Sequence, residues 1–142
     1  MTRDVPGTLL DPATATQDWQ SCRNMTLPFF GATGPDAPGL GLWRLSVPQT
    51  APELKLPWPQ LVEWHGGQRW LRAPVSAHAQ LRVAAAAVGG TVTLFVAPDD
   101  GSASAAPRFE PLKEPSSGIH RRLKAEFDPA GILNRARLYP DF

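Results

Sequence analysis

The sequence contains very little cysteine and no long apolar run. Cys22, the single cysteine in 142 residues, has no partner for an internal disulfide, which favours a reducing compartment. No apolar stretch approaches the roughly 18 residues of a membrane-spanning helix, and the first residues lack the apolar core of a signal peptide. We therefore expect a cytoplasmic protein that does not itself insert into a membrane.

Blocks of like charge and metal-ligand spacings are also missing. The formal net charge is +1 and the densest basic pair is Arg121-Arg122, so nucleic-acid binding has little electrostatic support. The three histidines, His65, His78 and His120, are far apart and the chain has one cysteine, so no metal site is predicted.

The common catalytic signatures do not occur. No Gly-x-Ser-x-Gly elbow is present. Gly39 and Gly41 lack the third glycine and the following helix of a dinucleotide fingerprint, and Gly89-Gly90 precedes a predicted strand. Cys22 falls on an apolar helical stripe, which favours a core thiol over a nucleophile. These patterns predict no catalysis by the chain alone.

Proline is abundant, at 16 of 142 residues, against a usual share of about 5%. Because proline removes a hydrogen-bond donor and fixes φ, short elements and much ordered loop are expected. The patterns predict a helix over 13–25, a second that is capped by Ser76 and runs to Val88, and a third that starts at Ser116 or Ser117 and ends at Asp128. They also predict strands over 42–47 and 91–96, a short edge strand at 109–110, and loops over 31–41, 48–59 and 97–108.

A β-hairpin is the clearest local signal. Gly66-Gly67 separates two strand-like runs, 61–65 and 68–72, which predicts a two-residue turn that pairs His65 with Gln68. In that register Val62, Trp64, Arg69 and Leu71 share one face, and Leu61, Glu63, His65, Gln68, Trp70 and Arg72 share the other.

The predicted fold class is α+β, an antiparallel sheet of about four strands with helices packed on one face, in the order α-β-β-β-α-β-α. Residues expected beneath the helices are Val47, Val62, Leu71, Val92, Leu94 and Trp64, with Arg69 stacked on the Trp64 ring. The opposite, polar face is expected to carry Arg44, Ser46, Glu63, His65, Gln68, Trp70, Arg72 and Thr93.

This polar face provides the candidate site residues. They are Arg44, Glu63, His65, Trp70 and Arg72. Arg44 and Arg72 are of the type that binds a carboxylate through two hydrogen bonds, or they are solvated. Two roles are open for Trp70: it covers a ligand or a partner domain, or it packs in the core. Core packing is expected for Trp19 and Trp64.

The carboxy-terminal sequence LKAEFDPAGILNRARLYP, residues 123–140, resembles the terminal signature of FAD-linked oxidases of the vanillyl-alcohol oxidase type. The signature residues retained are Lys124, Asp128, Pro129, Gly131 and Asn134, whereas Arg135 and Ala136 replace the usual proline and glycine. The segments LWRLSVP (42–48), LVEWHGGQRWL (61–71), GTVTLF (90–95) and HRRLK (120–124) are similar to the E subunits of glycolate oxidases.

This resemblance implies the carboxy-terminal cap region of an FAD-binding subunit. It predicts a flexible start at 1–12, an α+β cap domain at 13–127, and a tail at 128–142 that packs on an FAD domain outside this sequence. That domain would bind FAD, so no cofactor is expected here beyond a contact from Asn134.

The resemblance also implies partners and an activity. The implied complex contains a second flavin subunit and an iron–sulfur subunit, oxidises glycolate to glyoxylate, and associates with the inner membrane only through the complex. Two alternatives remain open from the sequence. One is a free-standing α+β interaction module, and the other a small hydrolase or isomerase that uses Glu63 and His65.

Overall fold

The computed structural model describes residues 7–31, 39–98 and 107–139. The chain divides by its contacts into two compact units, Met1–Ala37 and Pro38–Phe142. That boundary lies inside the predicted 13–127 domain. Among the described residues, no helix has the length and apolar character needed to cross a bilayer.

The first unit contains α1 (Pro12–Arg23) and a short 3-10 turn, Pro28–Phe30. Asp11 is the N-cap of α1, since its carboxylate accepts hydrogen bonds from the amides of Ala13 at 2.9 Å and Thr14 at 3.1 Å. The helix buries none of its side chains, and Trp19 is 75% exposed. The prediction that Trp19 packs in a core is therefore wrong, and Cys22 is half-buried.

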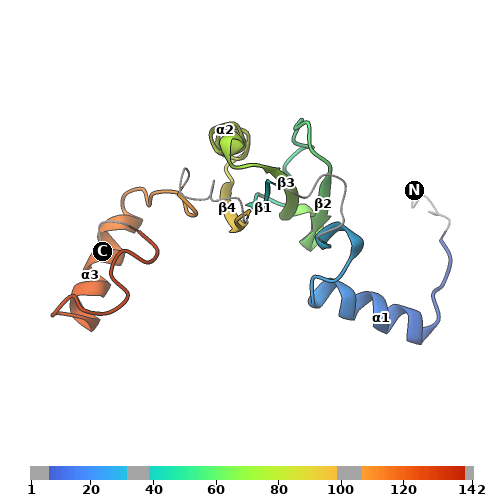
Figure 1. Ribbon diagram of the computed structural model, residues 1–142, viewed down its shortest axis with the longest axis horizontal. Helices are drawn as coiled ribbons and strands as arrows, with labels where there is room; N and C mark the ends of the chain where they lie inside the picture. Colours follow the sequence, from blue (N-terminus) through green and yellow to red (C-terminus); the bar gives the residue numbers. More distant parts are fainter. Residues whose placement is uncertain (1–6, 32–38, 99–106, 140–142) are drawn as a thin grey trace. The chain divides into compact units, whose positions relative to one another are not determined.

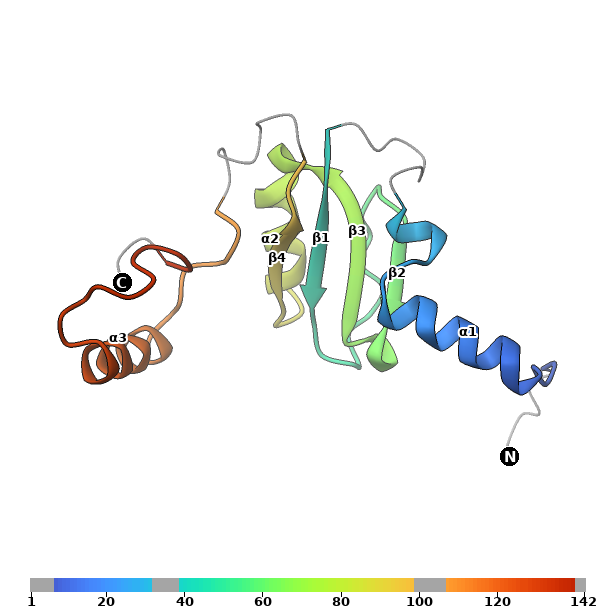
Figure 2. The same ribbon diagram turned by 60° about the horizontal axis from the view of Figure 1, so that its bottom comes forward.

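The second unit contains a four-stranded antiparallel sheet (Figure 2). Its strands are β1 (Leu40–Ser46), β2 (Gln60–Glu63), β3 (Gln68–Pro74) and β4 (Thr91–Val96), in the spatial order β2-β3-β1-β4. β3 and β4 both pair with β1 and are joined through α2 (His78–Ala86), which makes a split β-α-β unit. The predicted α+β fold is confirmed.

The hairpin turn is longer than the sequence predicts. Glu63, not His65, pairs with Gln68, because Trp64, His65 and Gly66 form a 3-10 turn between the strands. Trp64 and His65 both have positive φ, at 51° and 53°. The register is shifted by two residues, so the strand residues stay on the predicted faces, while Trp64 and His65 leave the sheet.

The core lies on one face of the sheet. Trp43 and Leu45 from β1, Leu71 and Ala73 from β3, and Val92 and Leu94 from β4 contact Leu81 and Ala85 of α2, together with Val47, Leu54 and Val75. Figure 1 shows α2 over this face. Val62 was expected in the core but is 53% exposed, because β2 is an edge strand, and Trp64 is 75% exposed in the turn.

The alanine-rich helix α2 and Gly90 pack closely against the sheet. A Cβ on Gly90 would lie 2.5 Å from the Ser46 carbonyl oxygen, so only glycine fits there. The predicted N-cap at Ser76 is wrong, because Val75–Ala77 forms a 3-10 turn and the helix begins at His78 without a side-chain cap.

The last helix, α3 (Ser116–Phe127), ends at Asp128 as the sequence predicts. Its buried contribution is small, since Ser117 alone among its residues is buried. The apolar stripe of Ile119, Leu123 and Phe127 is 44%, 51% and 80% exposed. Unlike α2, α3 adds no residue to the core cluster.

Candidate functional site

The sheet face opposite α2 brings together most of the predicted site residues. Arg44 on β1 is directly opposite Trp70 on β3. Arg72 follows two residues later on β3, opposite Leu42. Because side chains alternate along a strand, Arg44, Trp70 and Arg72 lie on one face, and we call this surface the second face.

Trp70 is the organising residue of the second face. Its side chain is 4% exposed and packs edge-on against Phe95, with ring centroids 5.0 Å apart and an interplanar angle of 81°. Its indole Nε1 donates a 2.7 Å hydrogen bond to Glu63 Oε2. Of the two roles left open for Trp70, its burial favours packing over direct contact with a ligand.

Glu63 holds the edge of the same cluster. Its Oε2 also accepts a 3.2 Å hydrogen bond from Gln68 Nε2. The carboxylate therefore receives two side-chain donors from β3, one of them from a buried ring. This geometry fixes the tryptophan's orientation and leaves Oε1 for another donor.

The arginines supply positive charge beside these rings. The Arg44 guanidinium carbon lies 5.8 Å from the centroid of the Phe95 ring, within cation–π range. Arg44 and Arg72 are both half-buried. An edge-to-face aromatic pair with a guanidinium group over the Phe95 ring suits an anionic or aromatic ligand, and the role of these residues in ligand binding stays a prediction.

His65 does not belong to the second face. It lies in the exposed turn after β2 with a φ of 53°, because the hairpin loop is four residues rather than two. Glu63, in contrast, is hydrogen-bonded to Trp70. The pairing of Glu63 with His65 that a small hydrolase or isomerase would need is therefore not formed.

Asn134 lies in the segment after α3, apart from the other candidates in sequence. Its φ is 46°, and its Oδ1 accepts a 3.4 Å hydrogen bond from Arg137 Nη1. Ala136 also has a positive φ, 54°. The resemblance places a glycine at this position, so the chain keeps the left-handed turn without the residue that favours it.

The signature aspartate organises the turn that follows α3. Asp128 is buried and accepts hydrogen bonds from the amides of Ile132 at 3.0 Å and Leu133 at 2.9 Å. Lys124 donates to Asp128 Oδ2 and to the Leu133 carbonyl. The Lys124 hydrogen bond, with those of the backbone, lowers the pKa of Asp128 to about 2.

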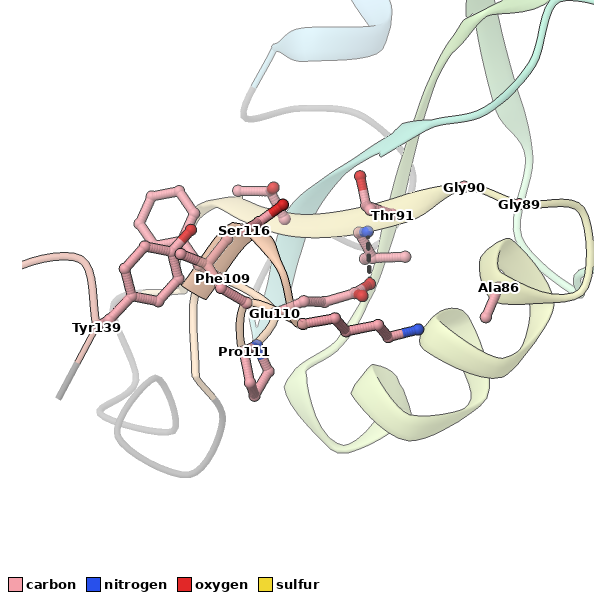
Figure 3. A pocket seen from close by; sticks show the side chains of 13 residues that line it. Ala86, Gly89, Gly90, Thr91, Phe109, Glu110, Pro111, Ser116 and Tyr139 are labelled. Atoms are coloured by element: carbon pink, nitrogen blue, oxygen red, sulfur yellow. Dashed lines mark hydrogen bonds between the residues drawn. The ribbon is translucent and has the colours of Figure 1, made fainter. Parts of the chain in front are cut away.

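The outer edge of β4 borders a hollow of about 410 Å³ (Figure 3). Glu110 Oε1 accepts a 2.8 Å hydrogen bond from the Val92 amide, and the Arg108 carbonyl accepts one of 3.0 Å from the Leu94 amide. Residues 107–110 thus cover the edge without forming the predicted strand. Phe109 and Tyr139 both line this hollow and lie next to each other, with ring centroids 6.3 Å apart.

Arg69 has a structural role that the sequence did not predict. It was expected to stack on Trp64, but it is 5% exposed and lies beneath the 48–59 segment. It donates to the carbonyls of Pro52 and Ala51 at 2.8 Å and of Gly66 at 3.3 Å. The sequence did contain a signal for this role. Arg69 lies two residues before Leu71 and therefore on the core face, where a buried arginine needs several hydrogen-bond acceptors.

The described residues contain no group of three or more His, Cys, Asp or Glu side chains placed to hold a metal ion. For FAD, the described residues supply an aromatic and cationic face. The turn between β3 and α2 contains no glycine. That FAD is bound mainly by a domain outside this sequence stays a prediction.

Comparison with known proteins supports the resemblance found in the motifs. The chain is 39% identical over 127 residues, or 89% of its length, to "Glycolate oxidase subunit GlcE" of Escherichia coli (strain K12). The chain resembles a glycolate oxidase subunit. It spans 32% of the length of GlcE. No family model and no solved structure matches the chain.

The match to GlcE confirms the resemblance that the separate segments predicted. A match over 127 of the 142 residues necessarily includes the strands of the second face. The roles of individual residues do not follow from the similarity, because it covers a third of GlcE.

Proposed function

We propose that this chain is the carboxy-terminal cap, on the substrate side, of the FAD-binding subunit of a glycolate oxidase. The observation that carries the proposal is the 39% identity to GlcE over 89% of the chain. The second face supports it, because the half-exposed Phe95 ring, which packs on the buried Trp70, and the Arg44 guanidinium form an aromatic and cationic surface suited to a flavin ring and an anionic substrate.

In this proposal the second face is directed toward the isoalloxazine. The flavin supplies the redox chemistry when it is bound. Arg44 and Arg72 would orient the carboxylate of a 2-hydroxy acid, and Glu63 would keep the Trp70 ring in place. Asn134 would contact the cofactor from the 128–142 tail, which would pack on the FAD domain.

The proposed setting is a cytoplasmic complex with a second flavin subunit and an iron–sulfur subunit. By itself the chain is proposed to be inactive and to hold no FAD. The exposed stripe of Ile119, Leu123 and Phe127 supports the proposed place in a larger assembly, since apolar surface of this kind marks a contact with other protein.

The direct experiment mixes the purified chain with equimolar FAD and records the flavin absorption spectrum. We expect a spectrum of free flavin after gel filtration and no oxidation of glycolate. Stoichiometric co-elution of flavin, with a shifted spectrum, would contradict the proposal that FAD is bound elsewhere.

The second candidate is a free-standing α+β interaction module, which the same exposed α3 stripe favours. The two candidates differ in the partner. Joining the chain to the remaining two thirds of a GlcE-type subunit restores FAD binding in the first case. In the second case it has no effect on flavin binding or on glycolate oxidation.

A further inference from the structure

The segment after residue 106 carries an unusual share of the positive charge. Between residues 107 and 139 the sequence has seven lysines and arginines against four acidic residues, whereas the rest of the chain has seven against nine. The whole-chain net charge of +1 therefore hides a basic carboxy-terminal region. Such a region attracts anions.

Two neighbouring hollows lie in this basic region, between α3 and the residues that follow it. One, of about 410 Å³, is lined by His120, Lys124, Asn134, Arg137 and Leu138. The other, of about 390 Å³, includes Arg108, Arg121, Arg137 and Tyr139 in its lining. Arg137 and Leu138 line both, and no acidic side chain of the described residues lines either one.

Not all of these cations carry uncompensated charge. Lys124 is paired with Asp128, and Arg121 lies 3.6 Å from Glu114. Among the described residues, by contrast, no carboxylate is paired with Arg108 or Arg137. These two guanidinium groups are therefore the centre of the positive potential in the hollows.

Arg137 is also held in position by the turn. Its amide donates to the Asn134 carbonyl at 3.2 Å, and its Nη1 donates to Asn134 Oδ1 at 3.4 Å. One guanidinium nitrogen is thus used within the turn, and the other edge of the fork remains for a ligand. A pre-oriented guanidinium loses less entropy on binding than a free one.

We propose that these hollows form a binding site for a phosphate group, with Arg137 as the principal ligand residue and Arg108 as the second cation. Guanidinium groups bind phosphate oxygens through paired, charge-assisted hydrogen bonds. The Asn134 amide lines one of the hollows and provides a neutral donor. This site lies apart in sequence from the second face, and it shares only Asn134 with the residues named in the proposed function.

The test is a titration of the ¹⁵N-labelled full chain with inorganic phosphate at constant ionic strength, followed by NMR. We expect saturable shifts in α3 and in residues 134–139. Arg137→Gln should weaken phosphate binding by about tenfold, because it removes a charge-assisted bidentate contact. Arg137→Lys, which keeps the charge but loses the fork, should bind with intermediate affinity.

Arg122→Gln is the matched control, because Arg122 lies on α3 but lines neither hollow. It should change affinity within about twofold, as expected for a distant surface charge. An equal loss in Arg122→Gln and Arg137→Gln, or the same shifts with chloride, would overturn the proposal. Equal binding of glycolate would overturn the assignment to phosphate.

Arg108→Gln provides a second variant that does not alter the turn after α3. If Arg137→Gln disturbs the α3 amide signals, the decision rests on Arg108→Gln. Reduced phosphate affinity in this variant supports the site, and unchanged affinity contradicts it.

Discussion

The sheet with α2 and the segment from α3 onward are stabilised in different ways. In the sheet, side chains such as Leu45, Leu71 and Leu81 are fully buried, and burial of apolar surface dominates. From α3 onward the apolar side chains of Ile119, Leu123 and Phe127 are exposed, and the buried side chains are the polar Ser117 in α3 and Asp128 directly after it. The first region contains its own core, whereas the second depends on a polar turn and leaves its apolar stripe uncovered.

This difference indicates which region gives the chain a stable fold and which is suited to bind something else. A helix with an exposed apolar stripe gains little stability from packing. The contrast with α2, which buries Leu81 and Ala85 against the sheet, is direct. Variants that test it should have large effects in the sheet and small or local effects after residue 115.

The largest expected effect comes from a matched pair of leucine truncations. Leu45→Ala should lower the free energy of unfolding by about 3 kcal/mol, since Leu45 is 0% exposed and leaves a cavity. Leu123→Ala, at 51% exposure, should change it by less than about 0.5 kcal/mol. Urea unfolding followed by tryptophan fluorescence measures both, and equal losses would end the contrast.

The next effect concerns the buried arginine. Arg69→Met should destabilise the sheet unit by about 2 kcal/mol, because three carbonyl groups lose their charged donor. Arg69→Lys should also destabilise it, since an ammonium group cannot reproduce the planar fork. Lys55→Met, at an exposed position, is the control. Wild-type stability in Arg69→Met would show that the 48–59 segment keeps its place without the hydrogen bonds from Arg69.

A smaller effect is expected in the turn after α3. Ala136→Gly should stabilise this turn by about 1 kcal/mol, because Ala136 has a φ of 54° and glycine adopts such values without a Cβ clash. Hydrogen exchange at the Arg137 amide reports the change. The same substitution at Ala125, inside α3, should destabilise by about 1 kcal/mol. Faster exchange in Ala136→Gly would refute the strained turn.

The smallest effect is the pH dependence of the same turn. The pKa of Asp128 is lowered to about 2, so its contribution to stability is complete above the unfolded value near 4 and is lost as the pH falls through 2. Lys124→Met should raise the pKa of Asp128 toward its ordinary range. NMR titration of the Asp128 carboxyl carbon measures this, and an unshifted value in wild type would contradict the network.

Much of the sheet could be predicted from the sequence, because alternation fixes the faces of β1, β3 and β4. The helix α3 could be predicted because Pro129 follows Asp128 and restricts its backbone. The hairpin turn could not be predicted, since a Gly-Gly pair suits a two-residue turn as well as the four-residue loop that forms. Trp64 and His65 instead adopt left-handed conformations, which residue preference disfavours.

The candidate site was predicted in part for the same physical reason. Strand parity places Arg44, Trp70 and Arg72 on the second face, and a register shift of two residues preserves parity. Burial could not be predicted, because Trp70 depends on its contacts with Phe95 and Glu63. The role of Arg69 also depends on a proline-rich segment that shows no periodicity.

The most direct test of the account is hydrogen exchange in α3, measured for the chain alone and for the chain joined to the remaining two thirds of a GlcE-type subunit. The account predicts that α3 amides exchange at least about tenfold more slowly in the joined protein, while the amides of β1 and β3 are unchanged. Unchanged exchange in α3, with FAD bound to the joined protein, would contradict the claim that the exposed apolar stripe of α3 packs on the flavin-binding part.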